Sequence, residues 1–373
     1  MKISKDQVLE TLKTIIHPSA ERDIVSLEMV QNLSLKKNRL QMDLVFTSAQ
    51  DPLKSSLKRA CEITLKDKFP SLEEITVSIQ TPMKPITPVA EEKVLPLVKN
   101  IIAISSGKGG VGKSTVASNL ALAFAGAGMK VGLIDADIFG PSIPRMLGLE
   151  DARPQVTKIE GKDKLIPVER YGIKVLSIGF FVEKEDATVW RGPMASNALK
   201  QLISDTEWGE LDYLFVDLPP GTSDIHLTLV QTVSVTGAII VSTPQPVALA
   251  DVIKGINMFR NDTINVPVLG LIENMSWFTP EELPDNRYYI FGKNGCAELA
   301  QKMNVPLLGQ IPLVQSVREG GDNGEPVVLR NSEVSNIYKS IAESLRIQVI
   351  KRNTDMDPTQ KVEITRKNYS DLK

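Results

Sequence analysis

A glycine-rich run between a predicted strand and a predicted helix restricts the possible folds of this 373-residue chain more than any other segment. The apolar segment IIAIS is followed by GKGGVGKST and then by the helical segment VASNLALAFAGAG. In this setting the pattern G-x-x-x-x-G-K-[ST] is typical of a loop whose backbone N–H groups hold phosphate oxygens at a helix N-terminus. We expect Lys113 to contact the β- and γ-phosphates of a nucleotide and the Ser114 hydroxyl to bind Mg²⁺. The predicted nucleotide-binding residues of this loop are Gly107, Lys108, Gly109, Gly110, Val111, Gly112, Lys113, Ser114 and Thr115.

Short apolar runs alternate with helical segments from about residue 100 to residue 348. Strands that are apolar on both faces and separated by helices indicate a parallel sheet covered on both sides. We therefore expect an α/β domain with a doubly wound, mostly parallel sheet. The predicted strands are IIAIS, KVGLID, IKVLSIG, YLFVDL, GAIIVS, VPVLGLI and VPLLGQI.

The N-terminal part of the chain has a different pattern. One helical pattern ends before Pro18, and a second helix is expected from about Pro52 to Lys68. With IVSLEMV, LQMDLVF and ITVSI as strands, the order is α-β-β-α-β, which is typical of a small α+β domain. The expected organisation is a small α+β domain at 1–80, a Pro-rich extended linker at 81–99, a P-loop domain at 100–350 and a polar tail at 351–373.

The overall charge of the chain argues against several classes of partner. The 43 Lys and Arg residues and 45 Asp and Glu residues leave a formal net charge of -2, which favours neither nucleic acid nor an anionic membrane surface. No uninterrupted apolar stretch approaches the roughly 18–20 residues that a membrane span needs. The N-terminus also lacks the apolar core of a signal peptide. We expect a cytoplasmic protein that binds neither nucleic acid nor membranes.

Polar side chains follow three of the predicted strands. Asp135 and Asp137 come at the end of KVGLID, and Asp217 comes near the end of YLFVDL. Ligands of doubly wound sheets bind beyond the carboxyl ends of the strands, where one acid can lie near Mg²⁺ and another can act on an attacking water. We expect Asp217 to hold the water shell of Mg²⁺ and residues 219–222 to form a loop that senses the γ-phosphate. The amide of Asn274, after a further strand, offers a donor and an acceptor to an adenine edge.

The second lysine of the glycine-rich loop, Lys108, is not needed by an ordinary phosphate loop. The sequence KGGVGKST resembles the deviant phosphate loop of the MinD/ParA/nitrogenase-iron-protein class of ATPases. This resemblance implies a homodimer in which Lys108 of one protomer reaches the phosphates of the other and stabilises transition-state charge, as an arginine finger does. It also assigns Asp137 to the water and switch region, Asp135 to the surroundings of the metal, and Asn274 to the base of ATP.

Six motifs in order resemble those of the Mrp/ApbC/Nbp35 family of iron–sulfur cluster carrier ATPases. The segment His17–Val30 resembles the MIP18-type domain that bacterial Mrp proteins often carry in front. The resemblance implies a Mg²⁺-dependent homodimeric ATPase that converts ATP and water to ADP and phosphate and delivers clusters to apoproteins. The six motifs lie at Ser105–Thr115, Asp135–Gly148, Trp190–Met194, Asp217–Asp224, Glu273–Phe278 and Ile311–Leu313.

The chain departs from the family pattern at the cluster ligands. Cluster-carrying members usually have a Cys-x-x-Cys pair after the ENMS strand, but Ser276–Gly292 contains no cysteine. A [4Fe-4S] cluster that bridges a dimer normally needs four thiolates, two from each protomer. Cys296 offers one per protomer, whereas the helical spacing of Cys61 indicates a buried core residue. His17 and His226 are expected to be capping or surface residues rather than ligands. Weaker substitutes with oxygen donors are Glu281, Glu282 and Asp285.

Two other functions remain open at this point. A cluster-free adaptor ATPase would bind client proteins through the N-terminal domain. A spatial-organising ATPase of the MinD or ParA type would bind a membrane or DNA in its ATP state, although the C-terminal tail has few bulky apolar residues for an amphipathic helix. Retention on lipid vesicles or on DNA in the presence of ATP would distinguish this class from the other two.

Overall fold

The computed structural model divides into two compact units, Met1–Glu91 and Glu92–Lys373, and each is described by itself. Most of the predicted linker, together with Trp190, Arg191 and the candidate ligand Glu281, lies outside the described residues. The structure describes residues 3–18, 22–36, 38–46, 53–80, 94–138, 140–181, 192–280, 282–283 and 285–362.

The first unit packs two helices against a three-stranded sheet. The central strand β4 is antiparallel to β3 and parallel to β5. Leu12 of the first helix, Leu57 and Leu65 of the second, and Met42 of β4 are buried together in its core. The predicted α-β-β-α-β order is confirmed, with an additional short pair, β1 and β2. The elements are α1 (Lys5–Leu12), β1 (Ile16–His17), β2 (Arg22–Asp23), β3 (Val30–Lys36), β4 (Arg39–Val45), α2 (Lys54–Lys68) and β5 (Glu74–Gln80).

The predicted strand IVSLEMV is wrong for most of its length. Residues 24–28 form turns, and the Met29 N–H donates to the Ile24 carbonyl at 3.0 Å. Glu28 has φ 56°, in the left-handed region that a continuous strand does not use. The Asp23 carboxylate also accepts hydrogen bonds from two of the backbone N–H groups that follow it. This local turn chemistry outweighs the β-propensity of the run.

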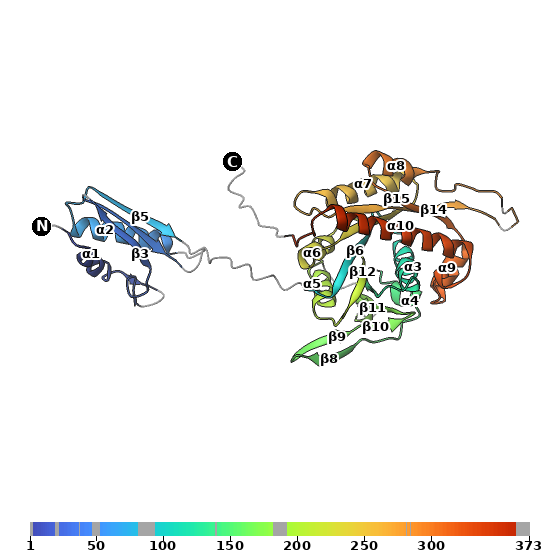
Figure 1. Ribbon diagram of the computed structural model, residues 1–373, viewed down its shortest axis with the longest axis horizontal. Coiled ribbons are helices and arrows are strands. Elements are labelled where there is room, and N and C mark those ends of the chain that lie inside the picture. Colours follow the sequence, from blue (N-terminus) through green and yellow to red (C-terminus); the bar gives the residue numbers. More distant parts are fainter. Residues whose placement is uncertain are drawn as a thin grey trace. The chain divides into compact units, whose positions relative to one another are not determined.

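Eight strands form one sheet in the second unit, in the order β10-β11-β7-β12-β6-β13-β14-β15 (Figure 1). Every pair is parallel except β10 with β11. All residues of β7 and β13 are buried, as expected for strands covered on both faces. The predicted doubly wound, mostly parallel sheet is therefore confirmed. The strands are β6 (Val98–Ser106), β7 (Val131–Asp135), β10 (Val168–Arg170), β11 (Ile173–Ser177), β12 (Leu211–Asp217), β13 (Gly237–Ser242), β14 (Val268–Phe278) and β15 (Leu307–Leu313).

Helices cover both faces of this sheet. The connection from β6 to β7 runs one way along the sheet, and those from β12 through β13 and β14 to β15 run the other way, so right-handed crossovers place their helices on opposite faces. Helix α3 is buried almost all round because it lies between the sheet and α10. The helices are α3 (Lys113–Gly126), α4 (Ile143–Met146), α5 (Gly192–Ser204), α6 (Asp224–Thr232), α7 (Pro246–Arg260), α8 (Gly295–Met303), α9 (Gln315–Asp322) and α10 (Glu333–Asp355), with 3₁₀ turns η1 (Ile178–Phe180) and η3 (Val327–Leu329).

Two hairpins extend away from the sheet in Figure 1. One is the antiparallel pair β8 (Gln155–Ile159) and β9 (Lys162–Ile166). The other continues from the carboxyl end of β14, where Phe278 pairs with Tyr288 in an isolated antiparallel bridge. The second hairpin starts at the same edge of the sheet as the glycine-rich loop.

The C-terminal segment differs from the expected loose tail. Helix α10 continues to Asp355, because its apolar face still packs on the core at Leu345 and Val349. Beyond the helix, the Thr359 hydroxyl donates to the Val235 carbonyl at 2.6 Å, and the Val362 N–H donates to the carbonyl of Val230 at 3.0 Å. These long-range contacts leave no trace in the spacing of apolar residues, which is why the sequence pattern did not predict them.

Candidate nucleotide-binding site

The glycine-rich loop joins the carboxyl end of β6 to the first residue of α3. Gly112 precedes this helix with φ 83°, a left-handed conformation that favours glycine. A Cβ at Gly107 would lie 2.7 Å from the backbone of Asp251 and Val252, because α7 approaches the loop closely there. Both glycines are therefore required by the geometry, and the loop presents its backbone at the positive end of α3.

Lys113 lies at the centre of a buried cluster of charged groups. Its ammonium is 2.6 Å from Oδ1 of Asp217 and 3.9 Å from Oδ2 of Asp137. The Ser114 hydroxyl donates to Oδ2 of Asp217 at 2.5 Å. The structure thus brings together four residues that the sequence predicts for phosphate, metal and water.

Asp135 lies beside Asp217 but has a different set of contacts. It is the register partner of Asp217 on the neighbouring strand and is fully buried. Its carboxylate accepts hydrogen bonds from the N–H groups of Asp137 and Ile143, both at 3.2 Å, and from the Ser177 hydroxyl at 3.0 Å. Asp135 therefore holds the loop after β7 against β11 and fixes the position of Asp137.

Burial changes the acid strength of both inner carboxyl groups. Desolvation, together with the nearby negative charge of Asp217, raises the pKa of Asp135 to about 7. Desolvation also raises the pKa of Asp217, while the ammonium of Lys113 and the hydroxyl of Ser114 oppose this effect. An additional cation at this place would favour the ionised form of both groups.

The loop after β12 is tied to the glycine-rich segment. The Gly221 N–H donates to the Ser106 carbonyl at 2.8 Å. His226 on α6 is buried rather than exposed, so the expectation of a surface residue is wrong, while the expected capping role is confirmed. Its Nδ1 accepts from the Ser223 N–H at 3.2 Å, which leaves Nε2 to donate to the Ser105 hydroxyl at 3.3 Å. His226 thereby joins the start of α6 to the strand that precedes the phosphate loop.

The neutral, buried His226 is expected to make the second unit sensitive to acid. Burial, reinforced by the charge of Lys113, lowers the pKa of His226 to about 4 from its ordinary 6.5. The unfolded chain then binds a proton that the folded chain excludes, so stability is lost as the pH falls from 6.5 towards 4, by up to about 3 kcal/mol. We expect His226→Gln, which keeps a donor and an acceptor without titrating, to remove this part of the pH dependence.

Urea unfolding followed by tryptophan fluorescence at pH 7, 5.5 and 4 checks this expectation. All three tryptophans, at positions 190, 208 and 277, belong to the second unit, so the signal reports its unfolding. Parallel loss of stability in the wild type and His226→Gln over this range would contradict it.

Asn274 contacts the loop from β14, and Lys108 is part of the loop. Nδ2 of Asn274 donates to the Val111 carbonyl at 2.8 Å. A Cβ at Gly112 would overlap this amide group. Lys108 is half-buried, and its carbonyl accepts a hydrogen bond from the Ser106 hydroxyl at 3.1 Å. Asn274 therefore contacts the phosphate loop directly, a contact that its strand-end position alone did not predict.

The described candidate cluster ligands form no metal-binding group within either unit. Cys61 and Cys296 belong to different units and are both buried. Burial raises the pKa of Cys61 to about 12 and that of Cys296 well above its usual range, which opposes the thiolate form that a metal requires. Glu282 and Asp285 are exposed on the second hairpin. Among the described residues, no group of three or more His, Cys, Asp or Glu side chains could hold a metal ion. Cys296 in this conformation is thus unsuited to the ligand role considered for it.

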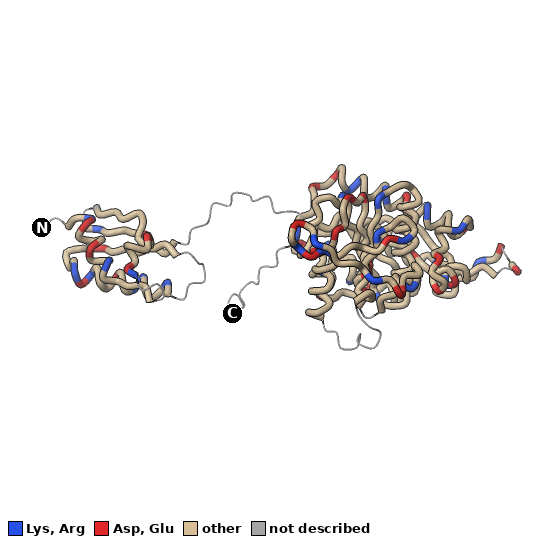
Figure 2. The backbone as a smooth tube through the Cα atoms, turned by 90° about the horizontal axis from the view of Figure 1, so that it is seen from below, with Lys and Arg blue, Asp and Glu red and all other residues tan. Residues whose placement is uncertain are grey.

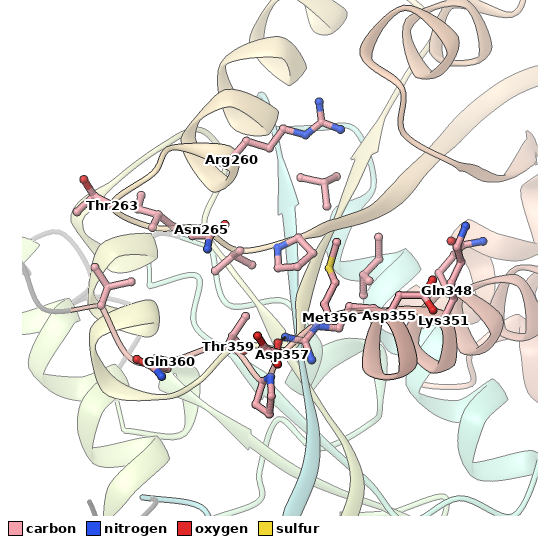
Figure 3. Close-up of a pocket in the computed structure, with 18 of the residues that line it drawn as sticks. Arg260, Thr263, Asn265, Gln348, Lys351, Asp355, Met356, Asp357, Thr359 and Gln360 are labelled. Atoms are coloured by element: carbon pink, nitrogen blue, oxygen red, sulfur yellow. Dashed lines mark hydrogen bonds between the residues drawn. The ribbon is translucent and has the colours of Figure 1, made fainter. Parts of the chain in front are cut away.

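A large pocket lies at the opposite edge of the sheet, away from the phosphate loop. It has a volume of about 1070 Å³ and is lined by the α7–β14 connection and by the C-terminal segment. Figure 3 shows Arg260, Asn265 and Thr359 around it. Val268 at the amino end of β14 also lines this pocket, whereas the phosphate loop follows a carboxyl end. The pocket is therefore separate from the nucleotide site.

Figure 2 shows Lys and Arg residues interspersed with Asp and Glu residues along the described parts of both units. Of the helices in the described residues, none has both the length and the apolar character needed to cross a membrane.

Three contributors to this site were not predicted in these roles. Ser177 holds Asp135, His226 links α6 to β6, and Glu273 is a fully buried carboxylate next to Asn274. Glu273 stands at the end of an apolar strand within a motif already singled out, and this position is the signal that could have identified it. Ser177 carries no such signal, because its role depends on the pairing of β11 with β7.

Family models match both units of the chain. The model described as NUBPL iron-transfer P-loop NTPase, of the ParA type, matches residues 97–346. The model described as iron-sulfur cluster assembly protein matches residues 5–79. The two matches fall within the two compact units of the structure.

Relatives named iron-sulfur cluster carrier protein resemble nearly the whole chain. The protein from Synechocystis sp. is 44% identical over 333 residues, covering 89% of this chain and 93% of the relative. The protein from Helicobacter pylori is 39% identical and covers 96% of this chain and 98% of the relative. The protein from Escherichia coli K12 is 42% identical, with coverage of 92% and 91%.

Solved structures match the second unit. A nucleotide-binding protein from Archaeoglobus fulgidus in complex with ADP superposes with a TM-score of 0.54 at 40% identity, over 62% of this chain and 88% of that chain. The septum site-determining protein MinD from Pyrococcus horikoshii, complexed with Mg-ADP, has a TM-score of 0.50 at 24% identity, over 68% and 98%, and shows the fold alone. The chain belongs to the Mrp/ApbC family of iron–sulfur cluster carrier proteins, with an N-terminal iron–sulfur cluster assembly domain and a ParA/MinD-like P-loop NTPase domain.

Proposed function

We propose that this chain binds and hydrolyses ATP as a homodimer and uses the cycle to deliver iron–sulfur clusters to apoproteins. The observation that carries the proposal is the cluster of Lys113, Ser114 and Asp217 at the start of α3, directly after a loop that also contains Lys108. Its support from known proteins is family membership together with the ADP that the Archaeoglobus fulgidus relative holds.

The residues at the start of α3 fit a magnesium ion. Ser114 and Asp217 offer the oxygen donors that Mg²⁺ prefers, and Mg²⁺ in nucleotide sites is usually held by one or two carboxylates together with phosphate oxygens and waters. We assign the ion to these two side chains, with Asp135 behind them. When bound, Mg²⁺ neutralises charge on the phosphates.

Each charged group of the site has a separate role in hydrolysis. In this structure the Lys113 ammonium is balanced by Asp217, and we propose that it moves to the β- and γ-phosphates when a nucleotide binds. Asp137, at the site and partly exposed, accepts a hydrogen bond from the attacking water. Asp135 keeps Asp137 in place through the backbone N–H that it holds.

The proposal of a homodimer rests on Lys108, the second lysine of the glycine-rich loop. Lys108 is a half-buried residue of the loop, and we propose that it contacts the phosphates bound by a second copy, where its charge stabilises the transition state. Dimerisation would then be a requirement for fast hydrolysis and would couple the nucleotide to the arrangement of the two protomers. We do not propose a spatial-organising role, because the relatives quoted above are named as cluster carriers.

The cluster itself is cargo in this proposal. The described thiols do not fit it in this conformation, because Cys61 and Cys296 are buried with raised pKa values. This observation favours a second candidate, an adaptor ATPase that binds apoprotein clients without holding a cluster and uses its N-terminal domain for the contact.

Counting iron separates the two candidates. The purified chain is incubated anaerobically with iron and sulfide, and iron and sulfide are counted per dimer for the wild type, Cys296→Ala and Cys61→Ala. The carrier with a bridging cluster is expected to hold about four iron atoms per dimer. If Cys296 is the ligand, only Cys296→Ala loses them. A wild type without bound iron would contradict the carrier and leave the adaptor.

A further inference from the structure

The buried carboxylate of Glu273 connects three elements at the edge of the nucleotide site. Its side chain is fully buried in the middle of β14. Oε1 accepts a hydrogen bond from the Gln310 amide of β15 at 2.7 Å, and Oε2 accepts from the Cys296 N–H of α8 at 2.8 Å. One side chain thus joins β14 to a neighbouring strand and to the first turn of a helix.

The burial of this carboxylate has an unfavourable free energy, which a purely structural contact would not need. None of the described Lys, Arg and His side chains forms an ion pair with Glu273, and a buried carboxylate without a cation is unfavourable by several kcal/mol. The N-terminus of α8 compensates part of this cost, because its N–H groups and dipole favour a negative charge. Asn294, at the N-cap of α8, makes no side-chain capping bond, so Glu273 supplies the cap from another element.

The backbone makes a local turn inside β14, immediately after Glu273. Met275 has φ 56°, a conformation that is unfavourable for a non-glycine residue and persists only where its surroundings enforce it. The Ser276 hydroxyl donates to the Glu273 carbonyl at 2.9 Å and closes the turn. The pairing of β14 with β15 changes register across this turn. The turn lies beside Asn274, whose amide donates to the Val111 carbonyl of the phosphate loop at 2.8 Å.

Glu273 also closes the base of the second hairpin. Strand β14 continues past Glu273 to Phe278, the chain passes through the Phe278–Tyr288 bridge, and it returns at Gly295 and Cys296. A Cβ at Gly295 would overlap the Pro244 carbonyl, so the returning chain has little freedom. Both ends of the hairpin segment are therefore held by the same carboxylate.

We infer that Glu273 is a positioning residue for the nucleotide: it fixes the local turn inside β14 so that Asn274 is held against the phosphate loop and faces the base. The inference rests on the proposed function, in which Asn274 contacts adenine. It predicts that loss of the carboxylate reduces discrimination between bases, rather than weakening all nucleotides equally.

The test compares ADP and GDP affinities, measured by calorimetry on the full-length chain. Glu273→Ala is expected to lower the preference for ADP over GDP about tenfold, the value of roughly one hydrogen bond. Glu273→Gln is expected to restore most of it, because the Gln310 amide can turn to pair with the new amide. Ser335→Ala, which removes a buried hydroxyl that bonds to the Val328 carbonyl on the α10 side of the domain, is the control and should keep the preference.

Asn274→Ala separates failure of this inference from failure of the proposed function. If Asn274→Ala lowers the preference and Glu273→Ala does not, the positioning role is wrong. If Asn274→Ala itself leaves the preference unchanged, base contact by Asn274 fails, and the inference fails with it. If circular dichroism shows that Glu273→Ala is not folded, Gln310→Leu is measured instead, because it removes only one of the two hydrogen bonds of Glu273. An unchanged preference for ADP over GDP in Gln310→Leu overturns the inference.

Discussion

Replacing Lys113 by alanine is expected to weaken ADP binding at least about 30-fold. The lysine is almost completely buried and lies 2.6 Å from Asp217. Its removal deletes the cation that we assign to the phosphates and leaves the buried carboxylates of Asp217 and Asp135 without a positive neighbour. Truncation of one partner in a buried charge pair costs about 2–5 kcal/mol, which corresponds to this change in affinity. Calorimetry with ADP and Mg²⁺ measures the effect.

A lysine on the neighbouring helix provides the matched control. Lys254 of α7 is largely exposed and pairs with Asp251 at 2.9 Å, so Lys254→Ala removes the same charge from the surface and should leave ADP binding nearly unchanged. Because the uncompensated carboxylates also lower the stability of Lys113→Ala, circular dichroism must show that it is folded. If Lys113→Ala is not folded, ADP binding is measured on Lys113→Gln instead. Tight ADP binding by a folded Lys113 variant would refute the assignment of the loop.

Replacing Lys108 by alanine is expected to slow ATP hydrolysis on the order of 10³-fold while leaving ADP binding nearly unchanged. A cation that acts from a second protomer stabilises the transition state rather than the bound ground state, so its loss lowers kcat more than affinity. The phosphate loop keeps its backbone and Lys113 in this variant. Steady-state phosphate release and ADP calorimetry measure the two quantities, and an unchanged rate would mean that Lys108 has no part in hydrolysis.

A mixing experiment shows whether Lys108 acts from the other protomer. Lys108→Ala and Asp137→Asn are each expected to be nearly inactive, but a mixed dimer has one site with both an intact Asp137 and an intact Lys108 from its partner. Equal mixing should therefore restore about a quarter of the wild-type rate, since half of the dimers are mixed and each has one working site. If Lys108 acts within its own protomer, no mixed dimer gains a complete site and activity is not restored.

The sequence predicted the parts of the fold that depend on local pattern. The seven apolar runs of the second unit became parallel strands, because residues apolar on both faces of a strand need cover on both sides. The glycine-rich loop lies between β6 and α3 as expected, since its spacing requires a strand, a tight turn and a helix in succession. The apolar pattern did not predict the local turns: residues 24–28 form turns where a strand was predicted.

For the candidate site, the sequence by itself determined which side chains stand at strand ends, and the tertiary structure decided what each contacts. The sequence placed Asp135, Asp137 and Asp217 at strand ends, whereas strand order set Asp135 beside Asp217 and gave its oxygens to neighbouring N–H and hydroxyl groups. Glu273 found its partners on β15 and α8, which lie 37 and 23 residues further along the chain. Cys296 was a candidate ligand in the sequence and is a buried thiol in the structure, because its burial also depends on segments distant in sequence. Periodicity records which face of an element is apolar, but burial and hydrogen-bond partners depend on segments distant in sequence, which only the packed fold brings together.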